Sequence, residues 1–353
     1  MRILEMITPS RIGGAETHVA RLVRDLRAVG DEVTVFSPAG RPFTGYLQEQ
    51  ELQPVSWRTS GKIDPISIYR TVKLIRQQNI EVVHTHLTSA TFIGAQAARI
   101  TGIPCVATLH GFTDAFWYRL PPRLIAVSQA VKAHFVAQGI PESRITVLHN
   151  GINLAEYLPC PLEEAKIAIG QSPDGPIVGV FGRLAPEKGQ DVALDALVQV
   201  VRAIPDVRLL IVGEGRCHTD LFAQAERLGI GANVEFCGFH ADPRPLMRAC
   251  DVVLVPSRKE GFGLAAIEAM ALARPVVATR VGGLPEVVAD GTTGTLVPPE
   301  SPAALAAAIV ELLQNPARAT AMGQAGNIRV AGNFDQRRQL QLLRGVFGGE
   351  IGS

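Results

Sequence analysis

Short apolar runs recur along the first half of the chain, and polar turn residues separate them. The runs span residues 2–8, 32–36, 81–86, 105–110, 124–128 and 145–148. They lack strict alternation of apolar and polar positions, as is typical of strands that are buried on both faces of a parallel sheet. Segments with helical spacing of apolar residues lie between them, for example residues 16–29 and 66–78. This alternation of strand and helix predicts a doubly wound α/β domain.

A second series of runs begins after an irregular stretch. The sequence HNGIN at residues 149–153 leads into a Pro-rich and charged segment up to Pro176, which we expect to be a linker. Strand-like runs then cover residues 176–184, 207–215, 234–239, 252–257 and 275–281. We therefore expect an α/β protein with two Rossmann-like doubly wound domains, residues 1–153 and 154–334, that face each other across a cleft. Residues 335–353 carry a helical pattern that could pack back on either domain, with Leu340, Leu342, Leu343 and Val346 on adjoining turns.

Composition agrees with this organisation and excludes several classes of protein. A chain of 353 residues is long for a single hydrophobic core. With 47% hydrophobic and 19% charged residues, a folded and soluble protein is expected. The N-terminus lacks the pattern of a signal peptide, and there is no apolar run of about 18 residues. Since the five cysteines also form no C-x-x-C pair, we expect a cytoplasmic protein.

The net charge is close to zero, but the two halves differ in sign. Residues 1–153 hold 16 basic and 11 acidic residues, whereas residues 154–353 hold 18 and 22. The mildly basic first half could favour an anionic acceptor or peripheral contact with the inner membrane surface, and it is equally within ordinary surface composition. The excess is far below that of nucleic-acid-binding proteins, so no nucleic-acid partner is expected.

Two loops that follow predicted strands carry residues suited to a phosphorylated ligand, which open parallel sheets bind at the carboxyl ends of their strands. Gly13 and Gly14 precede a predicted helix whose N-terminus could receive an anion, although a tight turn without a ligand would also explain them. The dinucleotide fingerprint G-x-G-x-x-G is absent there. In the second loop, Arg183 and Lys188 suit a diphosphate, and the alternative is a pair of solvated surface charges.

The stretch EGFGLAAIE at residues 260–268 is the most specific of these segments. If a helix starts near Phe262, the N–H groups of Phe262, Gly263 and Leu264 point toward the strand ends and can bind phosphate. Glu260 precedes that helix, and Glu268 lies about 1.5 turns inside it. Carboxylates at these two places suit the hydroxyls of a sugar and of a ribose, with the phosphates between them. The alternative is one capping glutamate and one solvated glutamate.

Two further features have less specific readings. His84 and His86 share one face of a predicted strand, a spacing that a metal site could use, but no carboxylate or cysteine obviously joins them. Contact with an acceptor or packing at the strand end is therefore preferred. The segment 112–123 combines aromatic and basic residues, and it could bind a lipid-linked acceptor at a membrane interface or pack under a short loop.

Taken together, the motifs resemble those of the retaining glycosyltransferases of family four, which have the glycosyltransferase-B fold. The resemblance covers nearly the whole chain, and E-x7-E at residues 260–268 is its most specific part. The other matching motifs are GGAE (13–16), LHG (109–111), HNGIN (149–153), GRLAPEKG (182–189), VGEG (212–215), CDVVLVPS (250–257) and GGLPE (282–286).

The resemblance implies roles for individual residues. Glu260 is expected to bind hydroxyls of the transferred sugar, and Glu268 is expected to bind the ribose. Arg183 and Lys188 are expected to clamp the diphosphate and to neutralise the charge that grows on the leaving group. His110 is expected to touch the donor sugar. The remaining expected donor contacts are Gly13, Gly14, Cys237, Gly238, Phe262, Gly263 and Leu264.

The activity implied by the resemblance is transfer of a sugar from a nucleoside diphosphate sugar to a hydroxyl acceptor with retention of configuration. The acceptor is expected to be a glycan or a lipid-linked molecule of the cell envelope. No cofactor is expected, and no metal, because Asp-x-Asp does not occur at a strand end. Two alternatives stay open, namely a nucleotide-sugar epimerase on the same fold and a non-catalytic subunit that binds nucleotide sugars.

Overall fold

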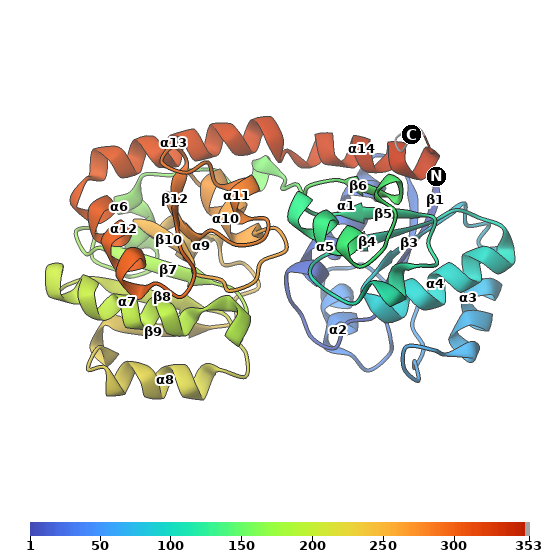
Figure 1. Ribbon diagram of the computed structural model, residues 1–353, viewed down its shortest axis with the longest axis horizontal. Coiled ribbons are helices and arrows are strands. Elements are labelled where there is room, and N and C mark those ends of the chain that lie inside the picture. Colours follow the sequence, from blue (N-terminus) through green and yellow to red (C-terminus); the bar gives the residue numbers. More distant parts are fainter. Residues whose placement is uncertain (350–353) are drawn as a thin grey trace. The chain divides into compact units, whose positions relative to one another are not determined.

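The computed structural model describes residues 1–349, which form two compact units (Figure 1). Unit 1 comprises Met1–Asn150 together with the C-terminal segment that begins at Arg337, and unit 2 comprises Gly151–Gln336. Among the described residues, no helix combines the length and the apolar character that crossing a membrane requires.

Unit 1 is built on one sheet of six parallel strands in the order β2-β1-β3-β4-β5-β6. The strands are β1 (Arg2–Ile7), β2 (Glu32–Phe36), β3 (Val82–His86), β4 (Cys105–Leu109), β5 (Arg123–Ala126) and β6 (Ile145–Val147). The helices are α1 (Gly14–Ala28), α2 (Pro42–Glu49), α3 (Pro65–Gln77), α4 (Thr88–Thr101), α5 (Gln129–Ala137) and α14 (Gln336–Gly348), with 3-10 turns η1 (Ala115–Tyr118) and η2 (Glu142–Arg144).

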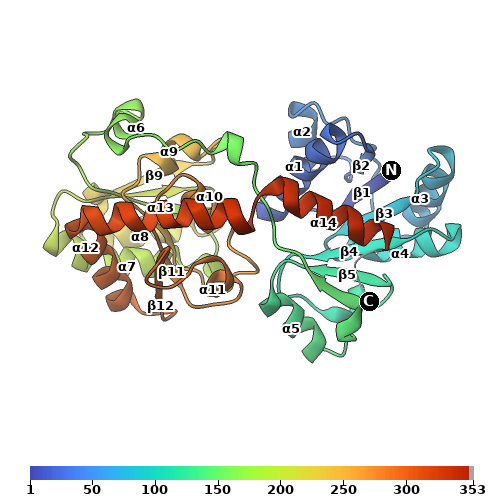
Figure 2. The same cartoon turned by 90° about the horizontal axis from the view of Figure 1, so that it is seen from above.

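The two faces of this sheet bury separate cores. Alternation along β1 places Ile3 and Ile7 in a core with α1 and α14, whereas Leu4 and Met6 pack against α3 and α4. The C-terminal helix α14 therefore belongs to the core of unit 1 (Figure 2), where the buried side chains are Leu340, Leu343, Val346 and Phe347. Leu342, on an adjoining turn of the same helix, is 37% exposed.

Unit 2 repeats the architecture with strand order β12-β11-β10-β7-β8-β9, all parallel. Its strands are β7 (Ile177–Phe181), β8 (Arg208–Val212), β9 (Val234–Gly238), β10 (Val252–Val255), β11 (Val276–Thr279) and β12 (Gly294–Val297). Its helices are α6 (Leu162–Ala168), α7 (Gln190–Ala203), α8 (His218–Arg227), α9 (Arg244–Arg248), α10 (Leu264–Ala271), α11 (Leu284–Val287), α12 (Pro302–Gln314) and α13 (Pro316–Asn333). The 3-10 turns are η3 (Leu154–Glu156), η4 (Pro186–Lys188) and η5 (Gly231–Asn233). The predicted α/β class with two Rossmann-like sheets is confirmed.

The expected linker up to Pro176 is wrong, because this segment is folded into unit 2. It contains α6, and Lys166 in that helix is only 3% exposed. Its Nζ lies 2.9 Å from Oδ2 of Asp251, so the buried ammonium is neutralised. The proline and charged residues therefore indicated a loop where a short helix forms, in which Lys166 is buried while Glu163 and Glu164 are exposed.

Each sheet contains one point at which the strand order reverses, because the chain adds strands first on one side of the first strand and then on its other side. In unit 1 this point lies between β1 and β3, and in unit 2 between β7 and β10. Crevices at such points are the usual ligand sites of doubly wound sheets. The loops that follow β7 and β10 carry Arg183, Lys188 and Glu260.

Candidate functional site

The loops after β7 and β10 are locked together through their backbones. Gly189 has φ +68°, and a Cβ atom added there would lie 2.1 Å from the carbonyl oxygen of Pro256. The backbone N–H of Arg258 donates to the carbonyl of Glu187 at 2.9 Å. Only glycine allows both the left-handed backbone and this close approach, so the GRLAPEKG segment has a fixed place beside EGFG.

This packing brings together Lys188 and Glu260, which are 72 residues apart. Lys188 Nζ lies 2.7 Å from Glu260 Oε2, and the two side chains are 28% and 13% exposed. Ser257 Oγ donates to the same carboxylate oxygen at 3.2 Å. The predicted cation and the predicted sugar-binding carboxylate therefore form one half-buried ion pair at the point where the strand order reverses.

Arg183, the second predicted cation, pairs with Glu187 of the same loop. The loop after β8 lies close to the loop that carries Arg183, since a Cβ atom on Gly213 would lie 2.1 Å from the carbonyl oxygen of Gly182. The N–H of Gly213 donates to the carbonyl of Gly238 at 2.7 Å. The loops after β7, β8 and β9 thus form one continuous rim.

The helix behind EGFG starts two residues later than Phe262, where we expected it. α10 begins at Leu264 with Gly263 as its N-cap, and the first N–H that bonds back belongs to Ala266, which donates to Gly263 O at 3.0 Å. Phe262 is 3% exposed, and its ring centroid lies 5.6 Å from that of Phe334. Gly263 has φ +111°, and a Cβ atom there would lie 2.6 Å from Leu284 Cδ2. Backbone conformation and this contact therefore account for the glycine.

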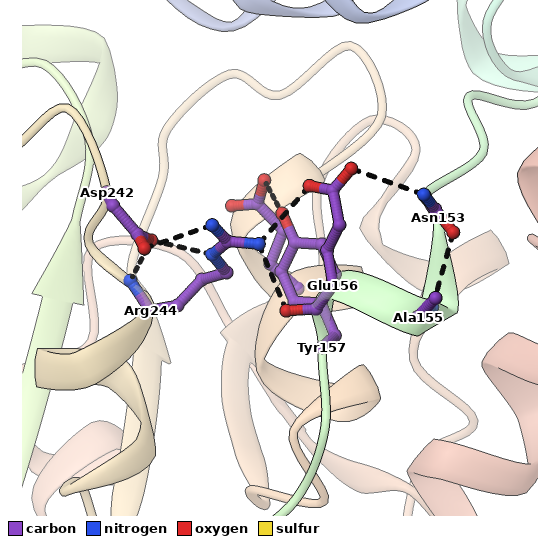
Figure 3. A network of polar contacts seen from close by, with 7 residues as sticks. Asn153, Ala155, Glu156, Tyr157, Asp242 and Arg244 are labelled. Atoms are coloured by element: carbon purple, nitrogen blue, oxygen red, sulfur yellow. Dashed lines mark hydrogen bonds and ion pairs between the residues drawn. The ribbon is translucent and has the colours of Figure 1, made fainter. Parts of the chain in front are cut away.

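Glu268 lies one turn after Leu264 on the same partly exposed face of α10. The hydroxyl of Tyr157 donates to its Oε1 at 2.9 Å (Figure 3). Arg244 covers the tyrosine ring at 5.6 Å from the centroid, and it bonds to Asp242 and to Glu156. A network that begins in the HNGIN region thus holds the predicted ribose-binding carboxylate.

Cys237 and Gly238 lie at the end of β9. Val212 pairs with Gly238 and Ile211 with Phe236, so Cys237 is the extra residue of a β-bulge. Burial, helped by Glu235, raises the pKa of Cys237 to about 11, so its thiol is unreactive near neutral pH.

In unit 1, His110 follows β4 and belongs to a cluster of ionisable side chains. His84 Nδ1 and His86 Nε2 lie 2.9 Å from the two carboxylate oxygens of Glu5. His86 Nδ1 lies 2.8 Å from His110 Nε2, and the rings of His18 and His110 meet edge-on at 5.8 Å. The expectation that no carboxylate joins His84 and His86 is wrong, because Glu5 of the neighbouring strand lies between them.

Burial and mutual interaction set the charges of this cluster. Burial alone would raise the pKa of Glu5, but His84 and His86 lower it to about 2. Burial lowers the pKa of His86 to about 4, and it lowers that of His110 well below the usual 6.5. Near neutral pH the cluster therefore contains one carboxylate together with neutral His86 and His110.

Gly13 and Gly14 form the start of α1, with Gly13 as N-cap in an extended conformation. His18 lies one turn further along the same helix, so its contact with His110 places the GGAE segment and His110 at the same end of this sheet. The predicted site residues therefore gather at the carboxyl ends of strands in each unit.

Comparison with known proteins agrees with these two groups. Residues 12–156 match the family described as Glycosyltransferase Family 4, and residues 163–329 match Glycosyl transferases group 1. A D-inositol 3-phosphate glycosyltransferase of Segniliparus rotundus is 40% identical over 86% of this chain and 72% of its own length. A GDP-mannose-dependent phosphatidylinositol monomannoside mannosyltransferase of Mycolicibacterium smegmatis is 31% identical over 96% of both chains.

The chain belongs to the family 4, group 1 glycosyltransferases. Its fold is also that of Anabaena HepE in complex with UDP-glucose, with a TM-score of 0.88 and 27% identity over 99% of this chain and 100% of the other. Membership gives this protein a glycosyltransferase activity, and it confirms the resemblance read from the motifs.

Three residues of this glycosyltransferase that lie among the candidate site residues were not anticipated from the sequence. Glu5 lies inside an apolar run of the sequence and is fully buried. An acidic residue at such a position was the only indication in the sequence that Glu5 could have a role. Glu187 is four residues after Arg183, a spacing that favours an ion pair on a helical turn. Tyr157 had no sequence signal at all.

Core packing, one of the two uses predicted for the aromatic and basic segment 112–123, is observed for a part of it. Tyr118 is buried against Phe135 in the core of unit 1. Phe116 is 58% exposed beside Trp117, and Lys62 Nζ lies 4.6 Å from the Trp117 ring centroid. Core packing thus holds for one part of the segment, and the other part presents an aromatic and basic surface.

Proposed function

We propose that this glycosyltransferase moves a sugar from a nucleoside diphosphate sugar to a hydroxyl acceptor, with retention of configuration and without a catalytic metal. The names of its relatives support this choice of donor, since one is GDP-mannose-dependent and HepE has been solved with UDP and UDP-glucose. The relative named for phosphatidylinositol monomannoside favours a lipid-linked acceptor of the cell envelope. The relative named for D-inositol 3-phosphate makes a small phosphorylated polyol the alternative acceptor.

The observation that carries the proposal is the ion pair of Lys188 and Glu260, with the Arg183–Glu187 pair beside it. Each cation is already matched by a carboxylate. A diphosphate that enters competes for Lys188 and Arg183, because it offers both of them more negative charge. As Lys188 turns to the phosphates, the Glu260 carboxylate becomes available to accept hydrogen bonds from sugar hydroxyls.

The same exchange explains how leaving-group charge is stabilised. Departure of the sugar adds negative charge to the terminal phosphate, and Lys188 and Arg183 lie where that charge is neutralised without a metal ion. The N–H groups at the start of α10 add fixed dipoles. On the face of the sugar from which it leaves, the phosphate can take the proton of the acceptor hydroxyl, so that the new bond forms with retention.

A panel of donors tests the proposal. We expect one nucleoside diphosphate sugar, among UDP and GDP sugars, to raise the melting temperature and to be consumed with an acceptor extracted from cell-envelope lipids. NMR of the product should show the anomeric configuration of the donor, and EDTA should leave the rate unchanged. Isomerised sugar from donor alone would instead indicate an epimerase. Donor binding without turnover on any acceptor would indicate a non-catalytic subunit.

A further inference from the structure

A chain of hydrogen bonds runs through the interior of unit 1 from Glu5 to His110. His86 donates through Nε2 to Glu5 Oε2 at 2.9 Å, and its Nδ1 lies 2.8 Å from His110 Nε2. Glu5 and His86 are 0% exposed, whereas His110 is partly exposed at the end of β4. One end of the chain is therefore sealed in the core, and the other end reaches the surface.

The direction of every bond in this chain follows from the ionised carboxylate. A carboxylate only accepts, so His84 Nδ1 and His86 Nε2 must each carry a hydrogen. A neutral His86 then has a lone pair on Nδ1, and His110 must donate to it from Nε2. His84 completes its own bonding with Thr108, whose hydroxyl lies 2.8 Å from His84 Nε2. His84 is thus a side branch that does not lead to His110.

We propose that Glu5 and His86 are positioning residues for sugar transfer, which hold His110 as the Nε2–H tautomer so that its Nδ1 accepts a hydrogen bond from a hydroxyl of the transferred sugar. This inference rests on the proposed function, in which His110 contacts the donor sugar. It names two side chains that themselves touch no substrate.

A neutral acceptor at this place suits the chemistry of glycosyl transfer. The sugar gains positive charge as the bond to phosphate breaks. A lone pair directed at one of its hydroxyls becomes more favourable as that charge grows, whereas an imidazolium would repel it. Burial, together with His86, His18 and His84, keeps the pKa of His110 well below 6.5, so the ring stays neutral during turnover.

The contacts of Glu5, His84 and His86 favour this reading over a metal centre, although the three side chains are close enough to hold an ion. Each imidazole nitrogen lies 2.9 Å from a different oxygen of one carboxylate, the distance of a direct N–H···O bond. A nitrogen that ligates a metal carries no hydrogen, so an ion would replace both of these bonds.

The test compares His86→Leu with His84→Leu in the full-length enzyme. Both remove a buried imidazole from the same carboxylate and the same strand, but only His86 contacts His110. Histidine ¹⁵N chemical shifts should show hydrogen on Nε2 of His110 in the wild type and in His84→Leu, and a mixture of tautomers in His86→Leu. We expect kcat to fall about ten-fold in His86→Leu with little change in donor KM. His86→Asn, whose amide oxygen can stand in for Nδ1, should recover part of the loss.

The spectroscopic result separates this inference from the proposed function. Hydrogen on Nδ1 of His110 in the wild type would overturn the inference even if donor turnover were normal, and this measurement does not require any variant to fold. Signals of His84 and His86 that shift on addition of Zn²⁺ and return with EDTA would also overturn it, in favour of a metal centre. Failure of every donor to react would contradict the proposed function and leave the tautomer result standing.

Discussion

Replacement of Lys188 by alanine tests the ion pair on which the proposed donor chemistry depends. Lys188 is the cation nearest to Glu260, at 2.7 Å, and its side chain is 28% exposed. The substitution removes the charge and leaves Glu260 with the hydroxyl of Ser257 as a hydrogen-bond donor. We expect chemistry to suffer more than donor binding, because charge on the leaving phosphate is greatest in the transition state.

The size of the effect follows from the geometry of the loop. One unit of new charge on a phosphate about 4 Å from an ammonium, at an effective dielectric constant of about 20, is worth roughly 4 kcal/mol. Solvent reaches a part of Lys188, so about 3 kcal/mol is a reasonable value, in line with removal of a single donor from an oxyanion site. This corresponds to a roughly 150-fold lower kcat.

Steady-state kinetics with the identified donor and acceptor provide the assay. Lys259→Ala is the matched control, because Lys259 is an exposed lysine next to Glu260 in the loop after β10, and its backbone N–H, which the substitution keeps, donates to the carbonyl of Glu187 in the loop that carries Lys188. The control should retain activity within about two-fold, as surface substitutions generally do. Circular dichroism and melting curves should show that both variants are folded.

Turnover of Lys188→Ala within a few fold of the wild type would refute the reasoning. It would mean that the Lys188–Glu260 pair is a structural contact and that leaving-group charge is neutralised elsewhere. A large rise in donor KM with unchanged kcat would also count against it, because Lys188 would then bind donor and transition state equally.

Three other consequences can be measured. Gly189→Ala should lower the stability of unit 2 by more than Gly229→Ala, since both glycines have φ near +70° but only the first would clash, at 2.1 Å from a carbonyl oxygen; thermal melting of the two variants decides. Tyr157→Phe should weaken nucleoside diphosphate binding about five-fold by calorimetry, because it removes the hydroxyl that donates to Glu268 at 2.9 Å. Unfolding by denaturant should show stability that is present above about pH 6.5 and lost toward pH 4, because burial lowers the pKa of His18 to about 3, that of His86 to about 4 and that of His110 well below 6.5, so the unfolded chain binds these protons first. His86 by itself accounts for a loss of about 3 kcal/mol.

The parallel sheets could be predicted from the sequence because strands buried on both faces must be apolar throughout. Strand β12 escaped prediction because its short apolar stretch, Gly294–Val297, lies between turn residues and prolines. The start of α10 was misplaced because Phe262, which reads as a helical residue, instead fills the core beside Phe334. Local helix propensity does not show which aromatic side chain will be buried in a tertiary contact.

The predicted donor-side residues lie in contiguous motifs, which sequence can show, whereas the residues that contact them depend on long-range pairing. Glu5 meets His84 because β3 lies directly beside β1, with these two residues in register. β3 lies beside β1 because the chain, after forming β2 on one side of β1, crosses to the other side of β1 before it forms β3. Neither apolar pattern nor motif spacing contains this step, so the carboxylate of the histidine cluster could not be assigned from sequence.

In both groups of candidate site residues, the charged side chains have partners within the protein. In unit 2 each cation of the predicted clamp has a carboxylate, and in unit 1 Glu5 receives hydrogen bonds from two imidazoles. A diphosphate that binds Lys188 must replace the contact between Lys188 and Glu260. Its binding free energy therefore contains only the difference between the two interactions, which limits the affinity for any anion. In the proposed exchange, the Glu260 carboxylate becomes available only when a diphosphate is present. The proposal therefore couples sugar recognition to recognition of the leaving group, and it predicts that a free sugar binds poorly while Lys188 is still paired with Glu260.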